Sequence, residues 1–188
     1  MRKTLPWLLG AALAVTAGTI TAITPSDDAL YAAISVPGHF DPDAEDQQPV
    51  TTRTVTASVI DATFAERIED GDWHADGTWL VVTVAASATR SEFDAELGLA
   101  KLHIGDEVFQ ASERTRSGFL DTGLRLGIDT TGMLAFELPG DARRGTAQLR
   151  LSSSFLTPHL DDVATLTLPL DELPTARSIE IRPPEPAW

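Results

Sequence analysis

The sequence predicts an all-β fold, an antiparallel β-sandwich, preceded by one N-terminal transmembrane helix. Two observations predict the sandwich. Apolar and polar residues alternate in about eight or nine short runs, and polar turn residues separate these runs with no long helical pattern between them. A third observation predicts the helix, because one uncharged stretch near the start has the length of a bilayer span.

Length, cysteine content and charge limit the class of protein. The 188 residues leave room for one domain of roughly 130 residues after an atypical N-terminal part. The absence of cysteine excludes disulfides, thiolate metal sites, a cysteine nucleophile and the acylated cysteine of a lipoprotein. A net charge of −14 repels phosphate backbones and anionic lipid headgroups, so we expect no nucleic-acid partner.

Residues 5–24 are the candidate membrane segment. They carry no charge, and a helix of this length spans about 30 Å, the thickness of a bilayer's hydrocarbon core. Arg2 and Lys3 precede the segment, which predicts a cytoplasmic N-terminus and an extracytoplasmic C-terminal domain. We therefore expect residues 1–26 to be an uncleaved signal anchor of a single-pass cell-membrane protein, in contact with the lipid bilayer through residues 5–24.

A cleaved signal peptide is the main alternative for these residues. Its apolar core is typically 7–15 residues long and is followed by a small-x-small cleavage site. Residues 16–18 (TAG) and 20–22 (ITA) fit such a site. Cleavage would make the protein secreted, and both interpretations place the domain outside the cytoplasmic membrane. A buried helix of a soluble protein is the third interpretation.

Residues 27–50 predict an acidic, proline-rich tether. Within it, residues 36–50 read VPGHFDPDAEDQQPV, with many prolines and acids and little to pack. This composition is typical of a mostly disordered spacer, in which His39 is solvated. The sandwich is then expected over residues 51–183, followed by a short C-terminal tail at residues 184–188.

The first predicted strands follow in chain order. Val55, Ala57 and Val59 alternate with hydroxyl residues and predict a half-buried strand. Residues 79–88, WLVVTVAASA, are apolar on both faces, as expected of a central strand covered on both sides or of an oligomeric contact. Residues 102–108 predict a hairpin with a two-residue Gly-Asp turn.

Five further alternating sets complete the predicted strands. Helical turns are expected at most at residues 62–69 and 94–99. The strand spacing suits an immunoglobulin-like sandwich, although the two cysteines of antibody domains are absent. The five sets are Leu124, Leu126 and Ile128; Leu134, Phe136 and Leu138; Ala147, Leu149 and Leu151; Ala164, Leu166, Leu168 and Leu170; and Ile179 with Ile181.

The order of these features resembles that of a known protein family. A charged start, one apolar segment and an acidic spacer precede the phrases DGTWLVVTVAAS, LHIGDEVFQAS, GMLAFELP and GTAQLRL. In this the chain resembles actinobacterial membrane-anchored proteins of unknown function, over residues 51–181. The resemblance implies an extracytoplasmic immunoglobulin-like (telokin-like) domain, and it supplies no catalytic residue.

Residues 69–82, EDGDWHADGTWLVV, resemble a metal-binding loop because acids and a histidine lie close together. An EF-hand loop needs oxygen ligands at positions 1, 3 and 5, a glycine at 6 and an acid at 12. Counted from Asp70, positions 5, 6 and 12 are His, Ala and Val, so this pattern fails. A looser calcium site of Asp70, Asp72 and Asp76 remains open. The main expectation is a polar connection with Asp-Gly turns before a strand that begins near Thr78.

No catalytic, cofactor-binding or metal-binding residue is assigned, and we expect no enzyme and no cofactor. The sequence has no GxSxG, SxxK, HExxH or glycine-rich phosphate loop. The histidines at 39, 74, 103 and 159 show no zinc-ligand spacing. His159, Asp161 and Asp162 would serve a catalytic triad only with a distant serine, and a solvated turn is the main expectation there. Nothing selects a pair of carboxylates for glycoside hydrolysis.

Four aromatic residues fall in or beside predicted loops, where sandwich domains commonly place binding residues. They are Trp73, Phe93, Phe119 and Phe155. The main expectation is that Phe119 and Phe155 close the ends of the core and that Trp73 packs over the sandwich edge. A patch that faces a partner is the alternative.

The expected function is that of a non-enzymatic cell-envelope protein whose extracytoplasmic immunoglobulin-like domain binds another protein. The expected partner is an unidentified envelope or integral-membrane protein, such as a transporter complex to which this protein is accessory. A tether of about twenty-five residues would keep the domain near the bilayer. The alternative is a secreted module that binds a carbohydrate or small ligand after signal cleavage.

Overall fold

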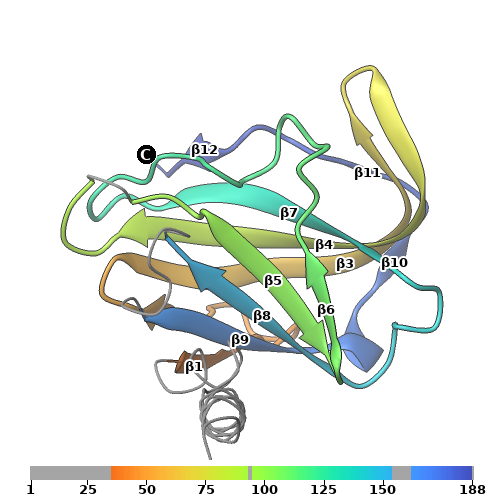
Figure 1. Cartoon of the computed structure of the whole chain (residues 1–188), viewed down its shortest axis with the longest axis horizontal. Coiled ribbons are helices and arrows are strands. Elements are labelled where there is room, and N and C mark those ends of the chain that lie inside the picture. The colour runs from red at the N-terminus through yellow and green to blue at the C-terminus, as the bar shows by residue number, and fades with distance from the viewer. Residues whose placement is uncertain (1–34, 93–94, 154–161, 188) are drawn as a thin grey trace, which may run out of the picture. The chain divides into compact units, whose positions relative to one another are not determined.

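Two β-sheets face each other in this fold, as Figure 1 shows. The computed structural model describes residues 35–92, 95–153 and 162–187. In this part of the chain the regular structure is β-strand, apart from one 3-10 turn, η2 (Leu170–Glu172). The all-β prediction is therefore confirmed, with two sheets as in a β-sandwich. None of the described residues forms a helix long and apolar enough to cross a membrane, and the predicted span at 5–24 lies outside them.

The first sheet has five strands and contains the predicted hairpin. β5 pairs with β6 across a turn at Gly105 and Asp106, where Gly105 has φ 58°, a conformation that glycine adopts without steric cost. β8 pairs with both β5 and β9 in antiparallel fashion. In spatial order the strands are β1 (Ser35–His39), β9 (Val163–Pro169), β8 (Thr146–Ser152), β5 (Leu99–Ile104) and β6 (Glu107–Gln110).

The second sheet has seven strands, with β4 in the centre. β4 pairs with β3 on one side and β7 on the other. Its run from Trp79 to Ala88 is buried except for the partly exposed Thr83, as predicted for a strand covered on both faces. The strands are β3 (Val55–Asp70), β4 (Trp73–Ala88), β7 (Thr130–Leu138) and the short β2 (Val50–Thr51), β10 (Thr175–Ala176), β11 (Ile179–Glu180) and β12 (Glu185–Pro186).

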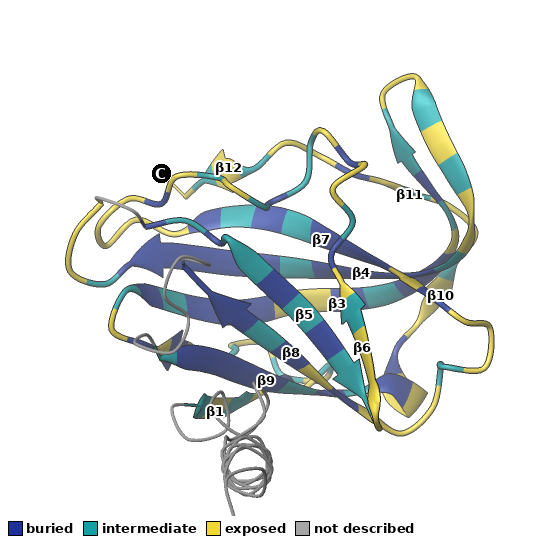
Figure 2. Cartoon of the chain, viewed as in Figure 1, coloured by how far each residue is buried: buried dark blue, intermediate teal, exposed yellow. Residues whose placement is uncertain are grey.

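The main core lies between the two sheets. Alternate residues of β7, β8 and β9 are buried in it, which confirms the predicted alternation in these strands. Each fully buried leucine contributes about 1.5–3 kcal/mol of transfer free energy. Figure 2 shows the long strands of both sheets as largely buried. The buried members of the predicted sets are Leu134, Phe136, Leu138, Ala147, Leu149, Leu151, Ala164, Leu166, Leu168 and Leu170.

A smaller apolar cluster lies on the other face of the second sheet. Along β4, Leu80 and Val82 belong to the main core, whereas Trp79 and Val81 belong to this second cluster. Successive strand residues point to opposite faces, so the two clusters lie on opposite sides of β4. Ile181 near the C-terminus packs into the second cluster. The C-terminal segment therefore covers a face that a plain two-sheet sandwich would leave in water.

Phe119 depends on a glycine in β7. A Cβ atom at Gly132 would come within 2.4 Å of Phe119 Cγ, closer than real Cβ contacts. The absence of a side chain at Gly132 lets the ring lie against the strand, where Phe119 is fully buried in the main core. Phe119 therefore closes the core, as we expected from the sequence, and it does not face solvent.

The hairpin of β3 and β4 extends beyond the end of β7, and the short β11 pairs with its β3 side. Each strand has 16 residues, which span about 50 Å when extended. β7 ends at Leu138, opposite Thr78, so the first residues of β4 pair with β3 alone. The projecting part, residues 67–76, is called the hairpin below, and Figure 1 shows it rising from the sheet.

The two ends of the sandwich are structurally distinct. At one end Ser35 aligns with Val163, and Thr54 Oγ1 lies 2.8 Å from Ser153 Oγ, which joins the start of β3 to the end of β8. Ala88, the last residue of β4, pairs with the first residue of β3 at this same end. We call it the Ser35 end. The opposite end, where β3 turns into β4, is called the hairpin end.

The predicted tether and tail are wrong in part, because both contribute strands. Ser35–His39 pairs in parallel with β9, and Phe40 and Val50 are buried in the main core. An edge strand tolerates proline, so the prolines of this stretch did not exclude a strand. His39 is exposed, as expected. In the predicted tail, Glu185–Pro186 pairs with the start of β7.

The antiparallel prediction holds for all strand pairs of the described residues except three, which involve β1, β10 and β11. β1 pairs with β9, and β10 and β11 pair with β3, in parallel. These three pairings join segments that are far apart in the sequence. Parallel neighbours need long crossover connections and leave no local turn signal, so the alternation of apolar residues could not reveal them.

Three further local predictions are wrong. The set at 124–128 forms isolated bridges and no strand, and Leu126 and Ile128 are exposed. Gly127, with φ 67°, turns the chain between them. Residues 62–69 belong to β3 and form no helical turn. Residues 95–98 form no helix either, and β5 begins at Leu99.

Candidate functional site

The acid-rich stretch forms the tip of the hairpin. Gly71 has φ 60° and makes the turn with Asp72. β4 begins at Trp73, earlier than the predicted start near Thr78. Asp76 and Gly77 lie within β4, so only the first of the two predicted Asp-Gly turns is present. Period-two alternation is weak over this polar segment, which explains why the sequence did not reveal the longer strand.

The hairpin register separates the three proposed calcium ligands. Asp70 is opposite Trp73, and Arg67 is opposite Asp76. Trp73 and Asp76 are three positions apart on one strand, so their side chains leave opposite faces of the hairpin. Asp70 shares the face of its cross-strand partner and therefore points away from Asp76. Among the described residues, no three His, Asp or Glu side chains are grouped to hold a metal ion.

Asp70 binds the segment that follows β6. Its carboxylate accepts hydrogen bonds from the Ser117 backbone N–H at 3.0 Å and from Ser117 Oγ at 2.7 Å. Partial burial raises the pKa of Asp70, but the bonds from Ser117 and from the Arg116 backbone together outweigh it, so the pKa lies below its usual value. This pair fastens the hairpin to a segment 47 positions away in the sequence.

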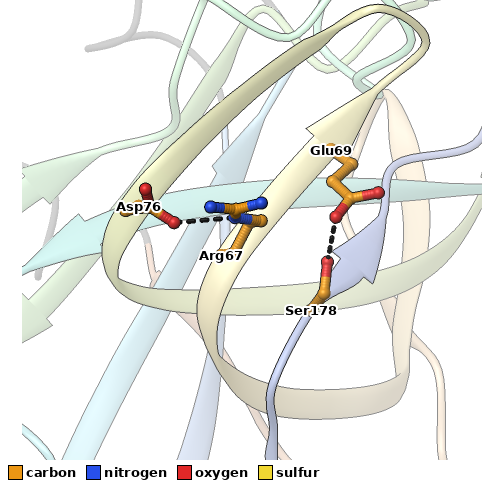
Figure 3. A network of polar contacts seen from close by, with 4 residues as sticks. All are labelled: Arg67, Glu69, Asp76 and Ser178. Atoms are coloured by element: carbon orange, nitrogen blue, oxygen red, sulfur yellow. Dashed lines mark hydrogen bonds and ion pairs between the residues drawn. The ribbon is translucent and has the colours of Figure 1, made fainter.

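Two polar contacts lie along the hairpin, as Figure 3 shows. Arg67 Nε donates to Asp76 Oδ1 at 2.7 Å, across the two strands. This bond from Arg67 lowers the pKa of Asp76. Ser178 Oγ donates to Glu69 Oε1 at 2.7 Å and ties the C-terminal segment to β3. Asp76 thus pairs with Arg67 on one face of the hairpin, and Asp70 lies on the other face.

Arg114 lies over the second apolar cluster. Its guanidinium carbon is 5.8 Å from the centroid of the Trp73 ring and 5.7 Å from that of Trp79. Its Nη2 also donates to Glu137 Oε2 at 2.7 Å. Three contacts therefore hold one guanidinium in place, and each cation–π contact at an exposed site contributes about 0.5–1 kcal/mol. Trp73 is partly buried against this cluster, as expected.

A cavity of about 560 Å³ lies between the hairpin tip and the segment after β6. We call it the hairpin pocket. Two smaller cavities, of about 110 and 200 Å³, lie beside Phe119 and beside Arg182. The hairpin pocket brings together aromatic, acidic and basic side chains from two regions of the chain. It is lined by Asp70, Gly71, Asp72, Trp73, Arg114, Arg116 and Ser117.

The other residues considered from the sequence do not converge. His39, His74 and His103 lie in β1, β4 and β5, and β9 and β8 separate β1 from β5. Asp162 is partly buried next to the start of β9. The remaining residues considered earlier lie outside the described part of the chain: Phe93, Phe155, His159 and Asp161.

The sequence indicated one side of the hairpin pocket but not the other. Trp73 and the acids were candidates, whereas Arg114, Arg116 and Ser117 were not. Their signal is short: the run ERTRS places two arginines close together in a strongly acidic chain. Only the fold shows that this run reaches the hairpin tip, because Ser117 and Asp70 pair through tertiary structure.

Comparison with known proteins gives no relative for this chain, since no family model, curated protein or solved structure matches it. The resemblance to actinobacterial membrane-anchored proteins therefore stays a prediction.

Proposed function

We propose that this protein is a non-enzymatic cell-envelope protein, anchored through residues 5–24, whose immunoglobulin-like domain binds an integral-membrane protein through its Ser35 end. Residues 5–24 supply the anchor because they are long, apolar and preceded by positive charge. The domain follows the anchor outside the membrane. Three structural features support this proposal.

The strand order supports the immunoglobulin-like assignment. Immunoglobulin domains have one sheet with the order A-B-E-D and another with C-F-G, extended beyond C in variable domains. Here β3-β4-β7 follows the order A-B-E, and β9-β8-β5-β6 follows G-F-C-C′. The hairpins β5–β6 and β8–β9 stay within one sheet, whereas the connections after β4, β6 and β7 cross between the sheets. β1 is an addition on the outer side of β9.

The position of β1 shortens the tether. β1 begins at Ser35, so only residues 25–34 separate the proposed bilayer span from the sandwich. An extended chain of that length reaches at most about 35 Å. The chain length alone therefore keeps Ser35 within about 35 Å of the end of the proposed span, whereas the hairpin end lies up to about 50 Å from the Ser35 end along β4.

Exposed apolar side chains at the Ser35 end are the observation that carries the proposed contact. Leu126 is 51% exposed and Ile128 is 36% exposed, and Leu126 forms a bridge with Ala88 at this end of β4. Exposed apolar side chains that gather in one place are typical of protein interfaces. A partner embedded in the membrane is within reach of this end. The net charge of −14 disfavours direct contact with anionic headgroups.

The proposal is tested with a photoreactive amino acid in the full-length chain, in its native membranes. With the photoreactive residue at position 126 we expect crosslinking to one integral-membrane protein. At the exposed position 144, which lies at the hairpin end between the end of β7 and the start of β8, we expect none. Leu126→Asp with Ile128→Asp should abolish co-purification of that protein, while Arg144→Gln should leave it intact. Recovery of the full-length chain in the soluble fraction, or equal crosslinking from both positions, would contradict the proposal.

A further inference from the structure

The hairpin pocket has balanced charge. Two arginines and two aspartates line it: Arg114, Arg116, Asp70 and Asp72. Arg114 also pairs with Glu137 beside it. A strongly anionic ligand would meet the acids of the pocket as well as a net charge of −14, and a strongly cationic ligand would meet two guanidinium groups. The pocket therefore favours a neutral ligand.

Two charged groups of the pocket have hydrogen-bonding capacity left for a ligand. The Asp70 carboxylate is taken by Ser117. Asp72 and Arg116 are exposed at the rim, and no described side chain bonds the Asp72 carboxylate or the Arg116 guanidinium. A carboxylate accepts hydrogen bonds and a guanidinium donates them. A ligand with hydroxyl groups, which do both, satisfies the two together.

An aromatic ring and a guanidinium complete the pocket. Trp73 lines it and is held by Arg114 and by the second apolar cluster. Arg114 is exposed, and its contacts to Glu137 and Trp79 favour one position of its guanidinium, which reduces the entropy lost on binding. The volume of about 560 Å³ lies in the range usual for small-ligand sites.

We propose that the hairpin pocket binds a neutral saccharide unit of one or two rings. The sugar hydroxyls donate to the Asp72 carboxylate and accept from the Arg116 guanidinium, and C–H groups of the sugar ring contact the part of Trp73 that Arg114 and the second apolar cluster leave exposed. This site is at the opposite end from the proposed membrane-protein contact. It does not depend on that contact or on the anchor, so either proposal can fail without the other.

The test uses the full-length chain in a detergent without a sugar headgroup. Glucose, N-acetylglucosamine and cellobiose serve as neutral probes, and glucuronate and inorganic sulfate as charged ones. Binding is followed by tryptophan fluorescence and by saturation-transfer NMR of the probe. We expect at least one neutral probe to bind saturably, and both charged probes to bind at least about tenfold more weakly.

Variants locate the binding. Asp72→Asn and Trp73→Ala should each weaken binding of the neutral probe by about tenfold or more, because one removes an acceptor charge and the other the ring. Arg144→Gln, at an exposed position outside the pocket, should leave it unchanged. Asp72→Asn is the safer variant because Asp72 is exposed and its change does not disturb packing. The proposal is overturned if no neutral probe saturates, if glucuronate or sulfate binds more tightly, or if Asp72→Asn binds as the unchanged chain does.

Discussion

The Ser35 end and the hairpin end are held together by different interactions. At the Ser35 end, hydrogen bonds between hydroxyl groups join segments that are distant in sequence: Thr54 to Ser153, and Ser35 to Thr165 at 2.6 Å. The side chain of Leu126 is half exposed at this end. The hairpin end is held by charged groups over a small apolar cluster, and residues 67–76 expose no large apolar side chain, although Val108 beside the β5–β6 turn is 47% exposed at this end. Exposed apolar groups are stabilised by a protein partner, and exposed charged groups by water or a polar ligand. The two ends therefore suit different partners.

Packing in the main core toward the Ser35 end should contribute most to the free energy of unfolding. Phe119→Ala should lower the free energy of unfolding by about 3–5 kcal/mol, because it empties a fully buried ring site against Gly132. Trp73→Ala at the hairpin end should cost about 1–2 kcal/mol, since that ring is only partly buried. Urea denaturation of both variants measures the difference. A larger loss for Trp73→Ala would reverse the ranking of the two ends.

Gly132 provides a second test of the same packing. Gly132→Ala should lower the free energy of unfolding by about 1–3 kcal/mol, because the added Cβ would overlap the Phe119 ring. Gly123→Ala is the matched control, since a Cβ there meets no atom within 4 Å. Thermal unfolding compares the two. Equal midpoints for both variants would mean that Phe119 has room to move away.

The Asp70–Ser117 pair should make the hairpin end sensitive to acid. Ser117→Ala removes one of the hydrogen bonds to Asp70 and should cost about 1 kcal/mol at neutral pH. The pKa of Asp70 is lowered in the folded protein, so its stabilisation is present above the unfolded value of about 3.9 and is lost as the pH falls through the folded value. The cost of Ser117→Ala should therefore shrink in acid. A cost that stays constant down to acid pH would show that Asp70 is not its source.

The Arg67–Asp76 pair should have the smallest effect. Both groups are exposed, so Arg67→Gln should leave the unfolding midpoint unchanged within error. The same change should return the pKa of Asp76 toward its ordinary value, because the bond from Arg67 is the main cause of its lowering. Carboxyl-detected NMR titration reads this directly. A clear loss of stability would mean that the hairpin depends on this ion pair.

The sequence was most informative where strands are long and half-buried. β7, β8 and β9 alternate regularly because one face packs in the main core, and the β5–β6 turn has its own glycine. β1 and β12 could not be found, because edge strands with prolines and acids lack the alternation. The 124–128 set alternates without forming a strand, since Gly127 breaks it.

The hairpin pocket, like the fold, could be predicted from the sequence only in part. Its acids and Trp73 are adjacent in the sequence and were visible as a cluster. Their spacing failed the EF-hand pattern and left only a looser calcium site open, whereas the register directs Asp70 and Asp76 to opposite faces. Arg114 and Arg116 come from another region and reach the pocket only through tertiary contacts. A side chain's partners are set by sheet register, which a local sequence pattern does not contain.

The distance of each end from the membrane is the most direct test of the account. Because the chain has no cysteine, Leu126→Cys and Asp72→Cys each give one labelling site in the full-length protein. Energy transfer from a dye at each site to labelled lipid in reconstituted vesicles measures its distance from the bilayer. We predict strong transfer from position 126 and weak transfer from position 72, since up to about 50 Å separates the two ends. Equal transfer from both sites, or stronger transfer from position 72, would contradict the account.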